Sequence, residues 1–137
     1  NSNTKMDIKV KLSYLWLFAM LNYIYADILT LMDSTVLKEM LTGSVGEMQI
    51  TPTFLLIGAI LMEIPIAMVF LSRILPYRIN RWANIIAALI KTLAVAASMF
   101  VGTPATYYLF FGIIEIACTL LIVGLAWKWR NPETETK

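Results

Sequence analysis

Four apolar segments, separated by short polar stretches, make up most of the chain. Each is about 20 residues long, which is the length that an α-helix needs to cross the hydrocarbon core of a bilayer. A soluble helix of this length would carry a charge every few residues, whereas each of these segments carries one ionisable residue. The pattern predicts an all-α integral membrane protein, a four-transmembrane-helix bundle formed by a single domain, residues 1–137. The expected helices are 12–32, 52–74, 81–101 and 104–127.

The second segment contains its own start signal and an internal break. Thr51-Pro52 supplies a cap followed by a proline at the first helical position. Pro65 lies within the helix, where it has no N–H and clashes with the carbonyl group four residues before it. We therefore expect a kink that frees the carbonyl oxygen of Leu61 near Glu63. That oxygen is a place for water, a cation or the side chain of Lys91.

Residues 33–50 interrupt the apolar pattern between the first two segments. The pattern predicts a short amphipathic helix in this first outer loop, lying on the membrane surface and ending at Gly43. An ordinary connecting loop with one helical turn fits about as well. The apolar face of the expected helix is formed by Val36, Leu37, Met40 and Leu41.

Composition excludes several classes of function. The chain is 59% hydrophobic and 15% charged, against about 25% charged residues in soluble domains. A net charge of +2, with basic residues at helix ends, gives no basic patch for nucleic acid. The chain has one cysteine, Cys118, which we expect to be a small core residue, and no histidine. We therefore expect no metal and no cofactor, and the bilayer as the main partner.

The basic residues are unevenly distributed along the four-span chain. Lys38 falls on one side of the membrane and Lys91 lies within a segment, while all the others fall on the opposite side. By the positive-inside rule, both termini are expected in the cytoplasm and the protein in the plasma membrane. The residues on the expected cytoplasmic side are Lys5, Lys9, Lys11, Arg73, Arg78, Arg81, Lys128, Arg130 and Lys137.

Each segment carries one ionisable residue: Asp27, Glu63, Lys91 and Glu115. A charge inside a membrane costs at least about 2.5–3.5 kcal/mol, so such residues usually face one another in the bundle interior. We expect a buried cluster of these four side chains. Three carboxylates against one ammonium would leave an excess of negative charge, so we expect at least one acid to be protonated at pH 7. The expected supporting residues are Tyr23, Pro65, Asn84, Ser98 and Tyr108.

Two of the carboxylates are expected at the same depth in the membrane. Pro52 precedes Glu63 by the same offset that separates Pro104 from Glu115. Helix rise places both carboxylates about 16 Å below the outer surface, close to the depth of Lys91. The matching residues are weak evidence for an internal duplication, but the equal depth does not depend on it.

Four sequence segments resemble a bacterial family of small, functionally uncharacterised four-helix membrane proteins. The segments are YADILTLMD (25–33), ILMEIPIAM (60–68), NRWANIIA (80–87) and IEIACTL (114–120). The resemblance covers nearly the whole chain. It implies a bacterial inner-membrane location and four spans, and it brings no activity, ligand or catalytic residue.

Three functions fit these features. Proton- or ion-coupled transport of a small solute by the charged cluster would need a homo-oligomer and a water path from each side. A structural or accessory subunit would pair Lys91 with Glu63 or Glu115 and expose an apolar seam to a partner helix. That seam would include Ala83, Ala87 and Ala94.

The third function is a binding site, or an acid/base enzyme, for a lipid-like molecule. Lys91 and Glu63 would be the acid/base pair and two tyrosines, Tyr23 and Tyr108, the walls. Such a site should show a pocket that opens to the lipid or to the outer face. Among these alternatives, an enzyme is less expected than a protein without catalytic activity.

Overall fold

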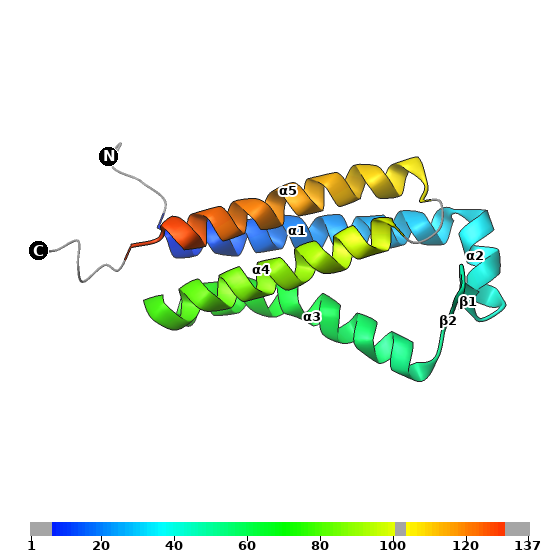
Figure 1. Ribbon diagram of the computed structural model, residues 1–137, viewed down its shortest axis with the longest axis horizontal. Helices are drawn as coiled ribbons and strands as arrows, with labels where there is room; N and C mark the ends of the chain where they lie inside the picture. Colours follow the sequence, from blue (N-terminus) through cyan, green and yellow to red (C-terminus); the bar gives the residue numbers. More distant parts are fainter. Residues whose placement is uncertain (1–6, 101–103, 131–137) are drawn as a thin grey trace, which may run out of the picture.

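The structure, a computed structural model, describes residues 7–100 and 104–130. Four long helices form a bundle (Figure 1): α1 (Ile8–Met32), α3 (Pro52–Ile74), α4 (Tyr77–Met99) and α5 (Thr106–Lys128). Each is long and apolar enough to cross a membrane, as the hydrophobic pattern predicted. The chain is therefore built as a multi-pass membrane protein.

A short helix and a small hairpin connect α1 to α3. Helix α2 (Ser34–Leu41) follows α1 directly, and strands β1 (Ser44–Val45) and β2 (Met48–Gln49) pair antiparallel. The sequence did not predict this hairpin. Gly43 and Gly46 have φ values of +88° and +59°, a region that favours glycine, and they make the two sharp changes of direction. The side chain of Asp33 caps α2, and Tyr107 Oη donates to Asp33 Oδ2 at 3.1 Å.

Three helix starts differ from the sequence expectation, the smallest difference being that α5 begins at Thr106 rather than residue 104. Helix α1 begins at Ile8 rather than residue 12, because the side chain of Asp7 caps it by accepting the Lys9 N–H at 3.2 Å. Helix α4 begins at Tyr77 rather than residue 81, because Pro76 has a fixed φ and can precede a helix directly. The expected end of the third helix at residue 101 lies outside the described residues.

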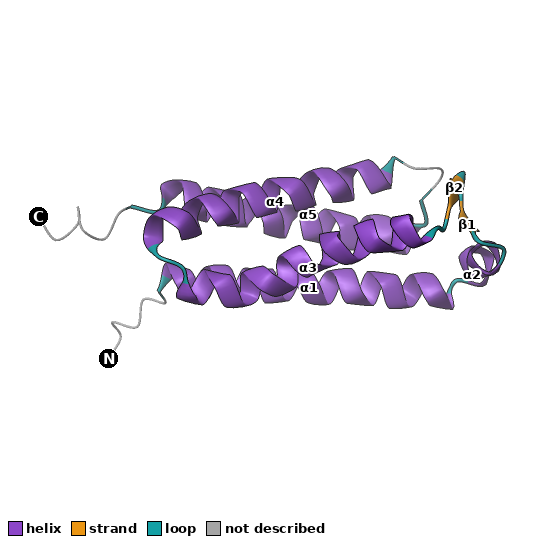
Figure 2. Ribbon diagram, turned by 90° about the horizontal axis from the view of Figure 1, so that it is seen from below, coloured by secondary structure: helices purple, strands orange, loops and turns teal. Residues whose placement is uncertain are grey.

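The helices are not packed evenly. Helix α1 packs on both α3 and α5, and α4 packs closely on α5. Helix α3 meets α4 mainly near their connecting turn, and its first half diverges from α4 toward the hairpin (Figure 1; Figure 2 shows the same bundle turned by 90°). Nearly all side chains of α3 before Leu61 are consequently exposed. The bundle is closed at one end and open at the other.

The closed end, here called the basic end, holds a buried polar network that joins three helices. Asn84 Oδ1 of α4 accepts hydrogen bonds from Trp16 Nε1 of α1 (2.7 Å) and from Ser72 Oγ of α3 (3.3 Å). Asn84 Nδ2 donates to Asn80 Oδ1 at 2.6 Å, and Asn80 Nδ2 donates to the Ser72 carbonyl oxygen at 2.7 Å. All four side chains are fully buried. The network holds the basic end together without any charged group.

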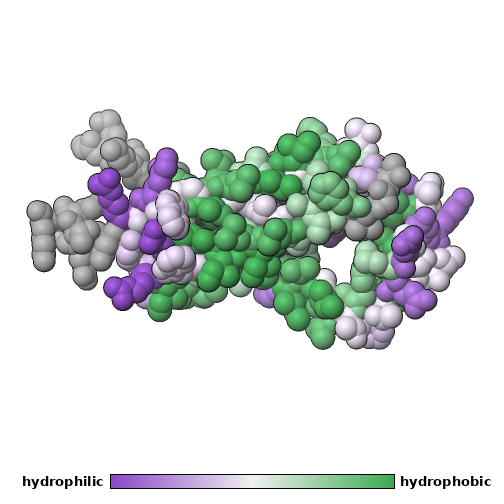
Figure 3. Space-filling model, in the orientation of Figure 1, coloured by the Kyte–Doolittle hydropathy of each residue, from purple (hydrophilic) through white to green (hydrophobic). Residues whose placement is uncertain are grey.

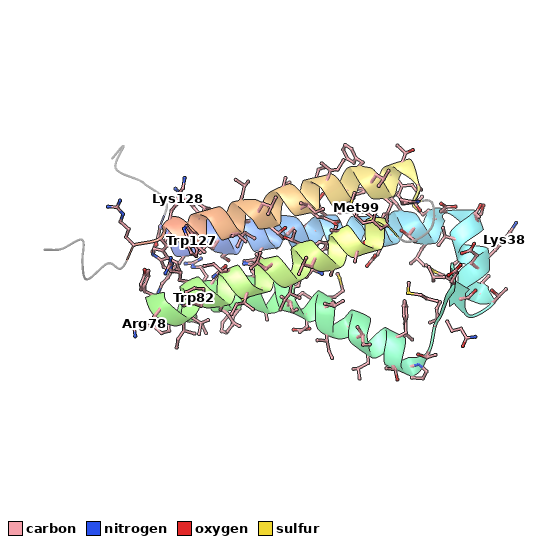
Figure 4. All side chains as sticks on the ribbon, in the orientation of Figure 1. Lys38, Arg78, Trp82, Met99, Trp127 and Lys128 are labelled. Atoms are coloured by element: carbon pink, nitrogen blue, oxygen red, sulfur yellow. The ribbon has the colours of Figure 1, made fainter. Side chains whose placement is uncertain are left out.

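Arginine and tryptophan side chains cover the basic end. Arg81 donates to the last carbonyl groups of α5, to Ala126 O at 2.9 Å and to Trp127 O at 3.0 Å. Ala126 O also accepts the Trp129 N–H at 3.3 Å. Both carbonyls lie in the last turn, where the regular helical donors end, so the guanidinium caps the helix. Figure 4 shows Trp82 at the same end, with Arg78 and Lys128. In the same figure Lys38 lies at the opposite end, here called the α2 end.

Replacing Asn84 by leucine should lower the free energy of unfolding by about 2–3 kcal/mol. The change leaves Trp16 Nε1 and Ser72 Oγ buried without an acceptor. Unfolding in mixed micelles measures the loss. Asn22→Leu is the matched control, because the Asn22 amide donates only within its own helix, to Phe18 O. Equal losses in the two variants would show that the network contributes no more than a local hydrogen bond.

Candidate functional site

The structure separates the four intramembrane charges into two buried and two exposed side chains. Lys91 and Glu115 are buried, with exposed fractions of 4% and 5%. Asp27 and Glu63 are exposed in the single chain. The expected cluster of four buried charges is therefore corrected to a buried pair, with Asp27 near it at the surface and Glu63 apart from it.

Lys91 is held by a backbone carbonyl and an aromatic ring. Its Nζ donates to the carbonyl oxygen of Leu61 at 3.2 Å and lies 4.1 Å from the centroid of the Tyr23 ring. Pro65 explains the first contact: it has no N–H to offer to Leu61 O, so that oxygen accepts from another group. Of the three occupants that the sequence allowed for this carbonyl, the structure places the lysine there. The face of the tyrosine ring also stabilises the ammonium by a cation–π interaction.

Lys91 lies close to carboxylates without forming an ion pair. Among the residues that the structure describes, no carboxylate oxygen is in a salt bridge with Lys91 Nζ. Asp27 and Glu115 nevertheless act electrostatically on its ammonium. The expected registry pair of Lys91 with Glu63 or Glu115 is thus replaced by the hydrogen bond to α3. This arrangement leaves the nearby carboxyl groups free to accept hydrogen bonds from another group.

Two polar atoms beside Lys91 are buried and have no hydrogen-bond partner among the described residues. They are Glu115 Oε2 and Tyr23 Oη. Most buried polar atoms in folded proteins are hydrogen-bonded, and an unpaired one costs about 1–3 kcal/mol. Both belong to side chains that are about 5% exposed. A donor arriving at this place would therefore find acceptors already in position.

Hydroxyl groups on α4 and α5 surround the buried pair. Tyr108 Oη donates to Ser98 Oγ at 2.6 Å, on the side of the α2 end. On the side of the basic end, Thr92 and Thr119 share a 2.7 Å hydrogen bond between α4 and α5. The helical period of the fourth segment places Thr119, one turn after Glu115, beside that carboxyl group. Nothing in the sequence indicated Thr92 as its partner.

Asn84 belongs to the network at the basic end and does not reach this site. Between the two lie fully buried apolar side chains, Ala19, Ala88 and Ile122. Because these side chains fill the space between the helices, the site is closed toward the basic end.

On the other side of the site α3 diverges from its neighbours, while Lys91, Glu115 and Tyr23 themselves stay buried. Ser13 Oγ donates to Val69 O of α3 at 2.7 Å, which identifies the side of α1 that faces α3. Asp27 lies on this same side, because it follows Ser13 by about four whole helical turns. Figure 3 shows an opening between the first half of α3 and the α2–hairpin segment. The carboxyl group of Asp27 is therefore accessible where the helices separate.

Glu63 lies on the opposite side of α3 from the site. The buried side chains of α3 are Pro65, Met68 and Ser72, which together with Leu61 form one stripe facing the bundle. Glu63 is two residues from both Leu61 and Pro65, or about 200° around the helix, so it faces outward. The pairing of Lys91 with Glu63 as an acid/base couple has no geometric basis in the single chain.

A model for a family of unknown function (DUF6326) matches residues 3–136. The chain belongs to this family. No curated protein and no solved structure matches it. The resemblance to a functionally uncharacterised family is thereby confirmed. Family membership supplies no ligand and no catalytic residue, so function has to be argued from the geometry around Lys91.

Replacing Lys91 should destabilise the protein less when the Leu61 carbonyl has a backbone donor within its own helix. Lys91→Met deprives Leu61 O of a partner, whereas Pro65→Ala returns a backbone N–H to it. The stability loss caused by Lys91→Met should therefore be about 1 kcal/mol smaller in the Pro65→Ala background. Thermal denaturation in detergent of the four proteins of this cycle measures the difference.

Pro76→Ala is the matched control for this cycle, because Pro76 lies in the turn before α4. It should leave the effect of Lys91→Met unchanged. Strict additivity of Lys91→Met and Pro65→Ala would contradict the role given to the freed carbonyl.

Proposed function

We infer that the chain is a membrane-embedded binding protein for an amphipathic, lipid-like molecule that carries a hydrogen-donating, cationic head group. One observation supports this most directly: Glu115 Oε2 and Tyr23 Oη are buried without a hydrogen-bond partner in the described part of the chain, and the Tyr23 ring lies against Lys91. A ligand head group that donates hydrogen bonds satisfies both atoms. Its apolar tail can lie in the membrane between the diverging halves of α3 and α4.

Charge supports a cationic head group. Two carboxylates, Asp27 and Glu115, act on one ammonium, Lys91. When all three are ionised, the site keeps an excess of one negative charge. In a medium of low dielectric constant, an arriving cation balances this excess and a second anion increases it. The ring of Tyr108 adds an aromatic surface, which also favours a cation.

The direction of access follows from the distribution of basic residues. Lys and Arg side chains concentrate at the basic end, so the positive-inside rule assigns that end to the cytoplasm and the α2 end to the outer face. The proposed ligand then enters from the outer leaflet or the outer surface. In a bacterium this location is the inner membrane, with both termini cytoplasmic.

Coupled transport would need a second path for the solute, from the site to the basic end. The packed layer of Ala19, Ala88 and Ile122 lies between the site and the basic end, so a transport cycle has to open it. The accessory-subunit alternative rests on an exposed alanine seam, whereas Ala87 is buried and Ala83 and Ala94 are partly buried. Binding from the side on which α3 diverges requires only a further movement of this weakly packed half of α3, which uncovers Glu115 and Tyr23, and for this reason we place it first.

The protein in nanodiscs should bind dodecylamine with an affinity that depends on Glu115. Glu115→Gln should weaken binding by at least about tenfold, as the loss of a charge-assisted hydrogen bond of about 1.5–3 kcal/mol implies. Tyr23→Phe, which removes only the unpartnered hydroxyl, should weaken binding less. The ligand-induced rise in melting temperature, followed over a concentration series, measures both effects.

Glu63→Gln is the matched control, because it makes the same chemical change outside the site and should leave the affinity unchanged. Dodecanol, which has the same tail and no charge, should bind more weakly than dodecylamine. If the Glu115 and Glu63 variants respond alike, the amine merely partitions into the bilayer and the proposed function is wrong.

The side of access can be measured with a cysteine introduced at position 27. In a Cys118→Ala background, Asp27→Cys should react with a membrane-impermeant thiol reagent added to the outer face of cells. Leu93→Cys, on the lipid-facing side of α4, should stay unlabelled. Labelling of position 27 from the cytoplasmic side alone would reverse the orientation proposed here.

A further inference from the structure

Glu63 is a carboxyl group in the middle of an otherwise apolar helix face. Helix α3 is the least buried of the four spanning helices. Around Glu63, within about 60° on the helical wheel, the side chains are aliphatic, aromatic or alanine. Several of them are among the most exposed large apolar side chains of the described chain. This face, here called the Glu63 face, comprises Leu56, Ala59, Ile60, Glu63, Ala67 and Phe70.

A carboxyl group facing hydrocarbon is unfavourable unless another polar group meets it. The other three charged side chains within the spanning segments do not interact with Glu63. Lys91 and Glu115 are buried in the site, and Asp27 lies nearer the α2 end on the α3-facing side of α1. The described part of the chain thus offers Glu63 no ionic partner, and we look for one outside it.

A second copy of the chain supplies such a partner at the right depth. Two copies that are inserted in the same direction have their Glu63 side chains at the same level of the bilayer. Two carboxyl groups that meet can complement each other, because the O–H of one donates to an oxygen of the other. The exposed central residues of α4 and α5 are apolar, among them Leu93 and Ile113. A contact of the Glu63 face with itself brings two carboxyl groups together, whereas a contact with α4 or α5 would bury Glu63 against apolar side chains.

We propose that the Glu63 face forms a symmetric interface with the same face of a second copy, with the two Glu63 carboxyl groups hydrogen-bonded at its centre. Ala59 and Ala67 lie one turn before and one turn after Glu63, so the two helices can approach closely there. A two-fold axis of this kind is the commonest symmetry of homo-oligomers. The interface uses the side of α3 away from Leu61 and Lys91, so the inference does not rest on the proposed function.

Cysteine cross-linking in native membranes tests the geometry. In a Cys118→Ala background, Ala59→Cys and Ala67→Cys should form disulfide-linked dimers on mild oxidation. Leu93→Cys and Leu120→Cys are matched controls on the exposed sides of α4 and α5, and they should remain monomeric. Equal cross-linking at all four positions would indicate random collisions and would overturn the proposed interface.

Substitutions at position 63 test the role of the carboxyl group. Glu63→Leu should weaken association by roughly tenfold, because it removes the hydrogen bonds between the copies. Glu63→Gln should associate nearly as well as the native chain, because two amides also donate and accept. Energy transfer between labelled copies, followed over a series of protein-to-lipid ratios in vesicles, gives the dissociation constants. Glu63→Leu should fold normally, because it places an apolar side chain toward the lipid. Dodecylamine binding by this variant verifies that the ligand site is intact.

Two outcomes would overturn the inference. The native chain could remain monomeric at every protein-to-lipid ratio, in which case a lipid head group or water is hydrogen-bonded to Glu63. Alternatively, Ala59→Cys could cross-link in membranes to a different protein and not to itself, in which case the Glu63 face binds a foreign helix. Loss of association in Glu63→Leu together with unchanged dodecylamine binding is the expected result, and it separates this inference from the proposed ligand site.

Discussion

The hydrogen bond from Lys91 Nζ to the Leu61 carbonyl is the interaction on which the rest of the structure depends. It exists because Pro65 withholds the backbone donor that Leu61 O would otherwise have. The bond joins α4 to α3 at the level where these helices begin to diverge. It also lets a lysine be buried without a direct counter-ion, so the nearby carboxylates keep their hydrogen-bonding capacity. One missing N–H thus determines both the shape of the bundle and the chemistry at its centre.

The two ends of the bundle differ in whether their buried polar groups are hydrogen-bonded. At the basic end Asn84 takes part in four hydrogen bonds in a fully buried network, and Arg81 caps α5. Each partner there is a neutral side chain or a carbonyl group, so the network stabilises the fold at little electrostatic cost. Toward the α2 end, Glu115 and Tyr23 are buried with unsatisfied atoms. Proteins tolerate such unsatisfied groups chiefly where a function requires them.

The sequence predicted the elements more fully than their packing. Uniform apolar runs fix the number of spanning helices, because nothing else satisfies the backbone in a membrane. Pro65 predicted the free carbonyl group correctly, since that effect is local. Glu63 was placed in the interior because helical periodicity gives the face on which a residue lies and not which face looks inward. The sequence did not predict that Asn84 bonds to Trp16 or that Thr92 bonds to Thr119. Both contacts depend on which helices are neighbours, and a single sequence does not specify this.

Helix α3 connects the two proposals through its opposite faces. Its inner stripe carries the Leu61 carbonyl that holds Lys91, and its outer face carries Glu63. The two surfaces lie about 200° apart around the helix, so they share no side chain. A ligand held beside Lys91 and a second copy bound at the Glu63 face therefore contact different residues of α3. For this reason a substitution at Glu63 can weaken association while the affinity for the ligand stays the same.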